Sequence, residues 1–169
     1  EWAHDTEISD NYMKDFYSGG QNNSAGVIIY DSRNYKITHN TIDRCAHGVQ
    51  PKGGGPENNL YGEISYNRIS NVKHAFRFHG PNFGPSGERN PIRYNLITGS
   101  TFFMEKTTST VNGVPTDIAD GIDFYSNTFA DGGSSEGIMY WTALQSAKTN
   151  TATNNIMSCS GPYTITYSG

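Results

Sequence analysis

Apolar and polar residues follow a fixed pattern that returns along the whole chain. The pattern is an apolar residue, two spacers, an asparagine, one spacer and a second apolar residue, as in Ile64-Ser65-Tyr66-Asn67-Arg68-Ile69. Six copies occur, and their asparagines are Asn11, Asn40, Asn67, Asn95, Asn127 and Asn155. Successive asparagines are 29, 27, 28, 32 and 28 residues apart. A period held this closely predicts a stacked architecture in which each repeat forms one coil.

Each repeat predicts three short strands separated by turns. In the second repeat the strands are expected at residues 34–39, 41–45 and 48–52, before a loop that opens at Gly53. No segment shows 3.6-residue periodicity over ten residues, so the pattern favours strands over helices. The sequence therefore predicts an all-β fold, a parallel β-helix of about six coils that forms one domain over residues 1–169. An antiparallel sandwich also uses short strands and glycine-rich turns, but it would not explain the constant asparagine phase.

The apolar residues of successive repeats are expected to stack in columns inside the coil. The first column would hold Ile37, Ile64, Ile92 and Phe124, the second Ile42, Ile69, Ile97, Phe129 and Met157, and the third Val49, Phe76 and Ile138. The asparagines would lie at corners, because asparagine tolerates a left-handed or bridge backbone conformation. The side-chain amide can also bond to the equivalent asparagine of the next coil. We therefore interpret the asparagine column as structural.

With these segments the chain resembles right-handed parallel β-helix proteins of the pectate-lyase-like superfamily. The resemblance covers about residues 5–167 and is clearest in Ile37-Thr38-His39-Asn40-Thr41-Ile42 and in the copy at residues 64–69. It implies a right-handed parallel β-helix. The superfamily includes lyases, hydrolases, epimerases, phage tailspikes and adhesins, so the resemblance is specific for the fold and poor for the function. We expect an extracellular or cell-surface location for a protein of this kind.

Charge and hydropathy narrow the range of partners. Twelve basic and sixteen acidic residues give a net charge of −4, so a basic nucleic-acid footprint is not expected. The chain has no run of 18 apolar residues, so no membrane span is expected. Both termini lie in strand-like sequence, which suggests a fragment of a longer β-helix. Unpaired strand edges at the ends would then take further coils or partner chains.

The two cysteines are expected to be unpaired. Cys45 lies in the second repeat and Cys159 in the sixth, so four strand spacings, roughly 19 Å, would separate them. A disulfide needs the two Cα atoms within about 7 Å of each other. Both thiols should therefore act as small buried apolar groups.

Chemistry in a β-helix with a filled interior has to lie on the outer face, on side chains that alternate with the buried ones. On the third strand of each repeat, alternation predicts the outward residues. They are Gln50 and Lys52, then Arg77 and His79, then Phe103 and Glu105, and finally Met139 and Trp141. The densest ionisable patch combines Lys52, Arg77, His79 and Glu105 with Trp141.

This patch suits an acidic polysaccharide, which is the expected partner. β-Elimination on a uronic acid needs a cation to neutralise the carboxylate, a base for the C5 proton and an acid for the leaving oxygen. Arg77 suits the first role, and Lys52 or His79 suits the second. The loops that follow this strand in three repeats, residues 53–59, 80–90 and 107–120, would form the walls of a groove.

Four further residues would support binding at this patch. Glu105 could hold a cation or orient His79, and Gln50 would contact the substrate beside Lys52. Trp141 or Tyr140 could stack on a sugar ring.

A second resemblance concerns the same strands. Val49-Gln50-Pro51-Lys52, followed one coil later by Phe76-Arg77-Phe78-His79-Gly80, is similar to the Lys-then-Arg-His-Gly arrangement of the chondroitinase and alginate-lyase branch. This resemblance implies that Lys52 is the base and Arg77 its charge partner. Two departures are visible. Phe78 separates Arg77 from His79, and Cys45-Ala46-His47 stands where that branch has acidic calcium ligands. No cofactor is therefore expected, and calcium stays open as an alternative.

Other candidates point to different functions. His39, His47 and His74 are expected at corners as hydrogen-bonded turn residues. Five carboxylates could supply the pair that a glycosidase needs, namely Asp117, Asp120, Asp123, Asp131 and Glu136. Three hypotheses stay open: a polysaccharide lyase, a non-catalytic structural, adhesive or tailspike-like β-helix that binds glycans or partner chains, and a glycosidase.

Overall fold

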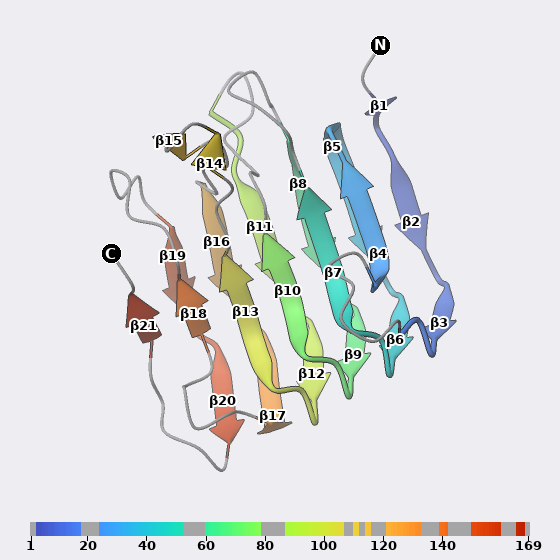
Figure 1. Cartoon of the computed structure of the whole chain (residues 1–169), viewed down its shortest axis with the longest axis vertical. Helices are drawn as coiled ribbons and strands as arrows, with labels where there is room; N and C mark the ends of the chain where they lie inside the picture. Colours follow the sequence, from blue (N-terminus) through green and yellow to red (C-terminus); the bar gives the residue numbers. More distant parts are fainter. Residues whose placement is uncertain are drawn as a thin grey trace.

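The computed structural model of the chain shows a parallel β-solenoid (Figure 1). It describes residues 3–17, 24–52, 60–78, 87–106, 110–111, 114–115, 121–132, 139–141, 150–159 and 165–167. Within these ranges the chain forms strands and no helix, which confirms the predicted all-β parallel fold. No helix of the described part is long and apolar enough to cross a membrane.

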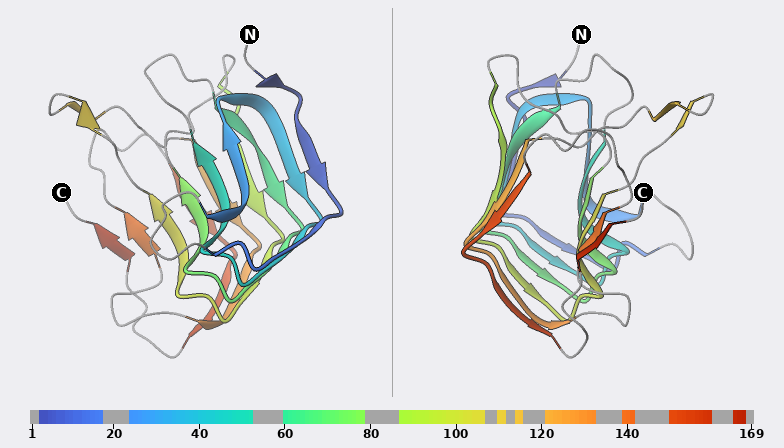
Figure 2. Two further views of the ribbon diagram at one scale, coloured as in Figure 1. Left: turned by 45° about the vertical axis from the view of Figure 1, so that its right-hand side comes forward. Right: turned by 90° about the vertical axis from the view of Figure 1, so that its left-hand side faces the viewer.

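Three parallel sheets surround the core, as the view along the stack in Figure 2 shows. Sheet A contains β1 (Ala3–His4), β2 (Glu7–Ser9), β5 (Ser32–Thr38), β8 (Tyr61–Ser65), β11 (Asn90–Arg93), β16 (Ile122–Tyr125) and β19 (Thr151–Thr153). Sheet B contains β3 (Tyr12–Lys14), β6 (Thr41–Asp43), β9 (Arg68–Ser70), β12 (Leu96–Thr98), β17 (Thr128–Gly132) and β20 (Ile156–Cys159). Sheet C contains β4 (Ala25–Tyr30), β7 (His47–Lys52), β10 (His74–Phe78), β13 (Phe102–Lys106), β18 (Met139–Trp141) and β21 (Ile165–Tyr167). A separate antiparallel pair joins β14 (Thr110–Val111) to β15 (Val114–Pro115).

The strand register confirms the first two apolar columns. On sheet A the aligned residues are Ile37, Ile64, Ile92 and Phe124. On sheet B they are Ile42, Ile69, Ile97, Phe129 and Met157. All of these except the half-buried Met157 are almost fully buried. Stacking therefore buries apolar surface that a single coil would leave in water.

The third column differs by one residue in the fifth repeat. Val49 is aligned with Phe76, Phe76 with Met104, and Met104 with Met139. Ile138, which we expected in this column, lies outside the described residues. Alternation fixes the phase within one strand but not across a long loop, so a displacement by one residue was not visible from the pattern.

The asparagine column is built as predicted from side-chain hydrogen bonds between coils. Asn67 Nδ2 donates to the carbonyl oxygens of Ile37 and Ser65, at 2.9 and 3.0 Å, and contacts Asn95 Oδ1 at 3.0 Å. Asn67 Oδ1 accepts from the backbone N–H of Asn40 at 3.0 Å and from its side-chain amide at 3.1 Å. The same backbone-to-Oδ1 bond links every neighbouring pair from Asn11 to Asn155.

The left-handed backbone conformation lies on the preceding residue and not on the asparagine. Tyr66, directly before Asn67, has φ of 58°, and the residues before the other five asparagines also have positive φ. A left-handed L-residue costs roughly 1–2 kcal/mol. The asparagine amide offsets that cost by bonding to the carbonyl two residues before it, as Asn67 does with Ser65. Our prediction of the strained position was therefore wrong by one residue.

The corner residues between sheets A and B also stack. The rings of His39 and Tyr66 lie 5.1 Å apart and nearly parallel, and the rings of Tyr66 and Tyr94 lie 5.0 Å apart. His39 is thus a corner residue, as predicted. These rings are half exposed, so they cover the left-handed turns without closing them off from solvent.

Cys45 is unpaired and buried, as the spacing predicted. Burial is the largest effect on its thiol and raises its pKa above the usual value. In a Cys159→Ser variant, we expect Cys45 in the folded protein to react with an aromatic disulfide reagent at least about 10²-fold more slowly than in urea, because the reaction needs local opening and a thiolate. Equal rates in the two conditions would contradict a buried position.

Candidate functional site

The strands of sheet C align four of the predicted site residues in one row. Arg77 is paired in register with Glu105, and Glu105 with Tyr140. Because Phe76 is aligned with Val49, the next residues along these two strands, Arg77 and Gln50, also lie beside each other. We call Gln50, Arg77, Glu105 and Tyr140 the Arg77 row. The backbone register thus brings together residues that are up to 90 positions apart in the sequence.

Three predicted site residues lie off this row. Lys52 follows Gln50 by two residues on β7. One strand spacing and two residues separate it from Arg77, so the two Cα atoms are about 8 Å apart. Trp141 is aligned with Lys106, which pairs with Phe78, so it lies one position from the row where alternation had placed it. His79 lies outside the described residues.

Arg77 lies on the outer side of sheet C but is almost completely buried. Its neighbours Phe76 and Phe78 pack against Phe124 in the core, with ring centroids 6.3 and 6.0 Å away. Alternation therefore directs Arg77 away from the core, as predicted. Only 8% of the residue is exposed. An arginine is buried at this level only when other groups compensate its charge or fill its hydrogen bonds.

The side-chain amide of Gln50, the neighbour of Arg77 in the row, makes no hydrogen bond among the described residues. The residue is 0% exposed, and neither Nε2 nor Oε1 has a hydrogen-bond partner among the described residues. A buried polar group without a partner costs about 1–3 kcal/mol. Such a group in a native structure calls for an explanation, and a ligand that supplies both a donor and an acceptor is one.

Lys52 occupies a more open position at the end of β7. It is aligned with Tyr30 on β4, and its Nζ lies 5.5 Å from the centroid of the Tyr30 ring. Tyr30 is 52% exposed. A cation above an aromatic face is held electrostatically, by roughly 0.5–1 kcal/mol at an exposed site. The ammonium group therefore lies at the margin between the buried row and solvent.

Two histidines that were expected at corners, His47 and His74, lie at this site. His47 and His74 are instead the first residues of β7 and β10, and both are about 95% buried. Their rings stack with centroids 5.0 Å apart, and their Nδ1 atoms are 3.0 Å apart. Arg77 Nη1 lies 3.3 Å from His47 Nε2. The sequence held one indication that we had not used: each histidine follows its repeat asparagine, Asn40 or Asn67, by seven residues.

Both imidazoles are neutral at pH 7. Burial is the main cause, and it lowers the pKa of His47 to about 4, with a further decrease from the positive charges of Arg77 and Lys73. Burial likewise lowers the pKa of His74 to about 2, with additional effects of His47, Lys73 and Arg77. A neutral histidine at this position can accept a hydrogen bond from arginine, whereas a charged one would repel it.

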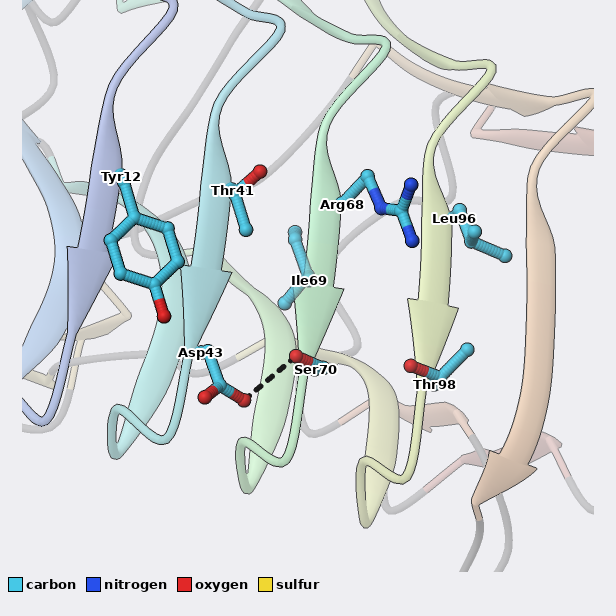
Figure 3. Close-up of a pocket in the computed structure, with 8 residues that line it drawn as sticks. All are labelled: Tyr12, Thr41, Asp43, Arg68, Ile69, Ser70, Leu96 and Thr98. Atoms are coloured by element: carbon cyan, nitrogen blue, oxygen red, sulfur yellow. Dashed lines mark hydrogen bonds between the residues drawn. The ribbon is translucent and has the colours of Figure 1, made fainter.

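The face of sheet B has a shallow pocket of about 300 Å³, which Figure 3 shows. Its lining comprises Tyr12, Thr41, Asp43, Arg68, Ile69, Ser70, Leu96 and Thr98. The only carboxylate of this lining, Asp43, accepts hydrogen bonds from Ser70 Oγ and Asn71 Nδ2, both at 2.8 Å. These bonds lower the pKa of Asp43. A carboxylate held in this way is a poor proton donor, so the pocket lacks the acid that glycoside hydrolysis needs.

The other carboxylates considered for a glycosidase are not brought together in the described part of the chain. Asp123 accepts a hydrogen bond from Arg89 Nη2 at 2.6 Å and another from Thr151 Oγ1. Burial raises the pKa of Asp123, but these bonds outweigh it and the net shift is downward. Asp131 is exposed at the register irregularity near the end of β17 and has φ of 55°. Asp117, Asp120 and Glu136 lie outside the described residues.

The described residues contain no group of three His, Cys, Asp or Glu side chains placed to hold a metal ion. The candidate site combines the Arg77 row with Lys52, His47 and His74. No protein-family model, curated protein or solved structure matches the chain.

Proposed function

We propose that the Arg77 row binds an acidic polysaccharide and that the protein cleaves it by β-elimination. The observation that supports this most directly is the buried amide of Gln50, which has no hydrogen-bond partner among the described residues and belongs to the residue beside Arg77 in the strand register. A uronic acid offers a carboxylate for the cation and hydroxyl groups that both donate and accept for the amide. Because Gln50 is 0% exposed, this contact requires local opening of the outer face of sheet C. In this proposal the protein is an extracellular relative of the pectate-lyase-like β-helix enzymes.

The proposed reaction assigns one step to each cation. Arg77 pairs with the substrate carboxylate and stabilises the negative charge that develops when C5 loses its proton. Lys52 takes that proton in the fraction of molecules in which its ammonium group has first lost a proton to water. The C4–O bond then breaks, a C4=C5 double bond forms, and the leaving oxygen takes a proton from water. Glu105 and Tyr140 continue the same row by backbone register.

A non-catalytic glycan-binding role is the second candidate. It is favoured by the burial of Arg77 and by the hydrogen bond that Arg77 makes to His47, because both features also suit an arginine that is held in place and takes no part in a reaction. In this case the same polysaccharide would be bound through the Arg77 row without being cleaved.

An absorbance assay at 235 nm with alginate, chondroitin sulfate and pectate separates the two roles, since β-elimination creates an unsaturated uronate. We expect product from at least one polymer, and a decrease in rate of about 10²–10⁴-fold in Lys52→Met, the loss that removal of a general base produces. The matched control is Lys36→Met, an exposed lysine on β5 of sheet A, which should keep the wild-type rate. Binding without product would favour the second candidate, and neither binding nor product would overturn both.

A further inference from the structure

The contacts of His47 determine which of its ring nitrogens carries the proton. Arg77 Nη1 lies 3.3 Å from His47 Nε2, and a guanidinium can only donate. His47 Nε2 must therefore accept with its lone pair. In a neutral imidazole the proton is then on Nδ1.

The contact between the two rings extends this argument to His74. His47 Nδ1 and His74 Nδ1 are 3.0 Å apart, so one of them donates and the other accepts. Because His47 Nδ1 carries the proton, it donates, and His74 Nδ1 accepts. The proton of His74 is then on Nε2. Moving the proton of either imidazole to its other nitrogen would place two N–H groups, or two lone pairs, against each other in a buried site.

We propose that His47 and His74 are positioning residues, which hold the guanidinium of Arg77 in one orientation through a directional chain of hydrogen bonds, Arg77 to His47 to His74. The two rings lie in adjacent coils, at the same phase of the repeat, so the parallel register places one directly over the other. In the proposed function, this orientation directs the guanidinium toward a substrate carboxylate. That purpose rests on the proposed function, while the chain of hydrogen bonds itself does not.

The test is the protonation pattern of the two rings, measured by long-range ¹H–¹⁵N correlation spectra of the ¹⁵N-histidine-labelled chain at pH 7. His47 should show a protonated Nδ1 and a lone pair on Nε2, and His74 should show the reverse. His39, which is exposed, serves as the internal reference and should show exchange between both forms. His→Gln variants assign the signals.

An Arg77→Met variant provides a second measurement. Without the donor that faces Nε2, the proton of His47 should no longer be confined to Nδ1. A wild-type spectrum in which His47 carries its proton on Nε2, or His74 on Nδ1, would overturn the proposal. The wild-type spectrum decides the question alone, so the result does not depend on whether any variant folds.

Activity then tests the positioning role. His74→Leu removes the acceptor of the chain and should raise KM for the cleaved polyuronide about tenfold, the effect of weakening one hydrogen bond to a charged group. His74→Asn keeps an oxygen near the position of Nδ1 and should restore most of the affinity. Equal KM values for wild type and His74→Leu would exclude positioning. The spectra do not require substrate, so a failed lyase assay with the predicted protonation pattern would reject the proposed function alone.

Discussion

Replacing Asn67 with leucine should lower the free energy of unfolding by about 3–5 kcal/mol, in the range of the most damaging single substitutions. Leucine has nearly the same volume but makes none of the five contacts of the Asn67 amide. Its introduction leaves the carbonyls of Ile37 and Ser65 and the N–H of Asn40 without this partner in a site that is 1% exposed. Each buried unsatisfied group costs about 1–3 kcal/mol. Urea unfolding followed by circular dichroism measures the difference.

The matched control for this substitution is Asn11→Leu, at the first position of the same column. Asn11 is exposed, and its side chain donates only to Ser9 O and Asn40 Oδ1 in the described contacts. We expect a loss of about 1 kcal/mol or less for this variant, because water can replace the missing partners. A loss at Asn67 no greater than that at Asn11 would show that the column does not stabilise the stack.

Acidification from pH 7 to pH 5 should reduce the free energy of unfolding by several kcal/mol, before most carboxylates titrate. Unfolded histidine has a pKa near 6.5, whereas burial holds His47 at about 4 and His74 at about 2. Below pH 6.5 the two histidines therefore bind protons in the unfolded chain but not in the native chain, and the free energy of unfolding falls as the pH falls. Each pH unit below 6.5 costs about 1.4 kcal/mol per histidine until the native group titrates, so the two together contribute roughly 2–5 kcal/mol.

The double variant His47→Gln/His74→Gln provides the control for this pH dependence. Glutamine does not titrate, so the variant should show a nearly flat free energy of unfolding between pH 6.5 and 5, whatever its stability at pH 7. An unchanged slope in the variant would mean that other groups cause the acid sensitivity. Chemical denaturation at fixed ionic strength gives both curves.

The apolar columns and the asparagine column could be predicted from the sequence because they repeat with one phase in every coil. Ile64 and Asn67 recur with spacings close to 28 residues, and a parallel register converts that spacing directly into contact. The outward direction of Arg77 followed from its position between two buried phenylalanines. These features depend on local alternation and period alone.

The sequence did not reveal that Gln50 and Arg77 on sheet C are buried. Alternation indicates that Gln50 and Arg77 point away from the core, but it contains no information on their burial, which other parts of the chain determine. The same limit applies to His47, since the interaction of its ring with Arg77 depends on side-chain reach across adjacent coils and not on strand alternation. The left-handed residue Tyr66 was missed because the conformation of a turn depends on hydrogen bonds that its neighbour Asn67 makes.

The direction of the hydrogen bonds in the asparagine column gives the stack a polarity. In each asparagine of the column from Asn11 to Asn127, the backbone N–H donates to the Oδ1 of the asparagine in the following coil. One face of the stack is thus complementary to the opposite face and not to itself. A strand layer can continue this column only head to tail, whereas a twofold contact between two identical faces would oppose donor to donor or acceptor to acceptor.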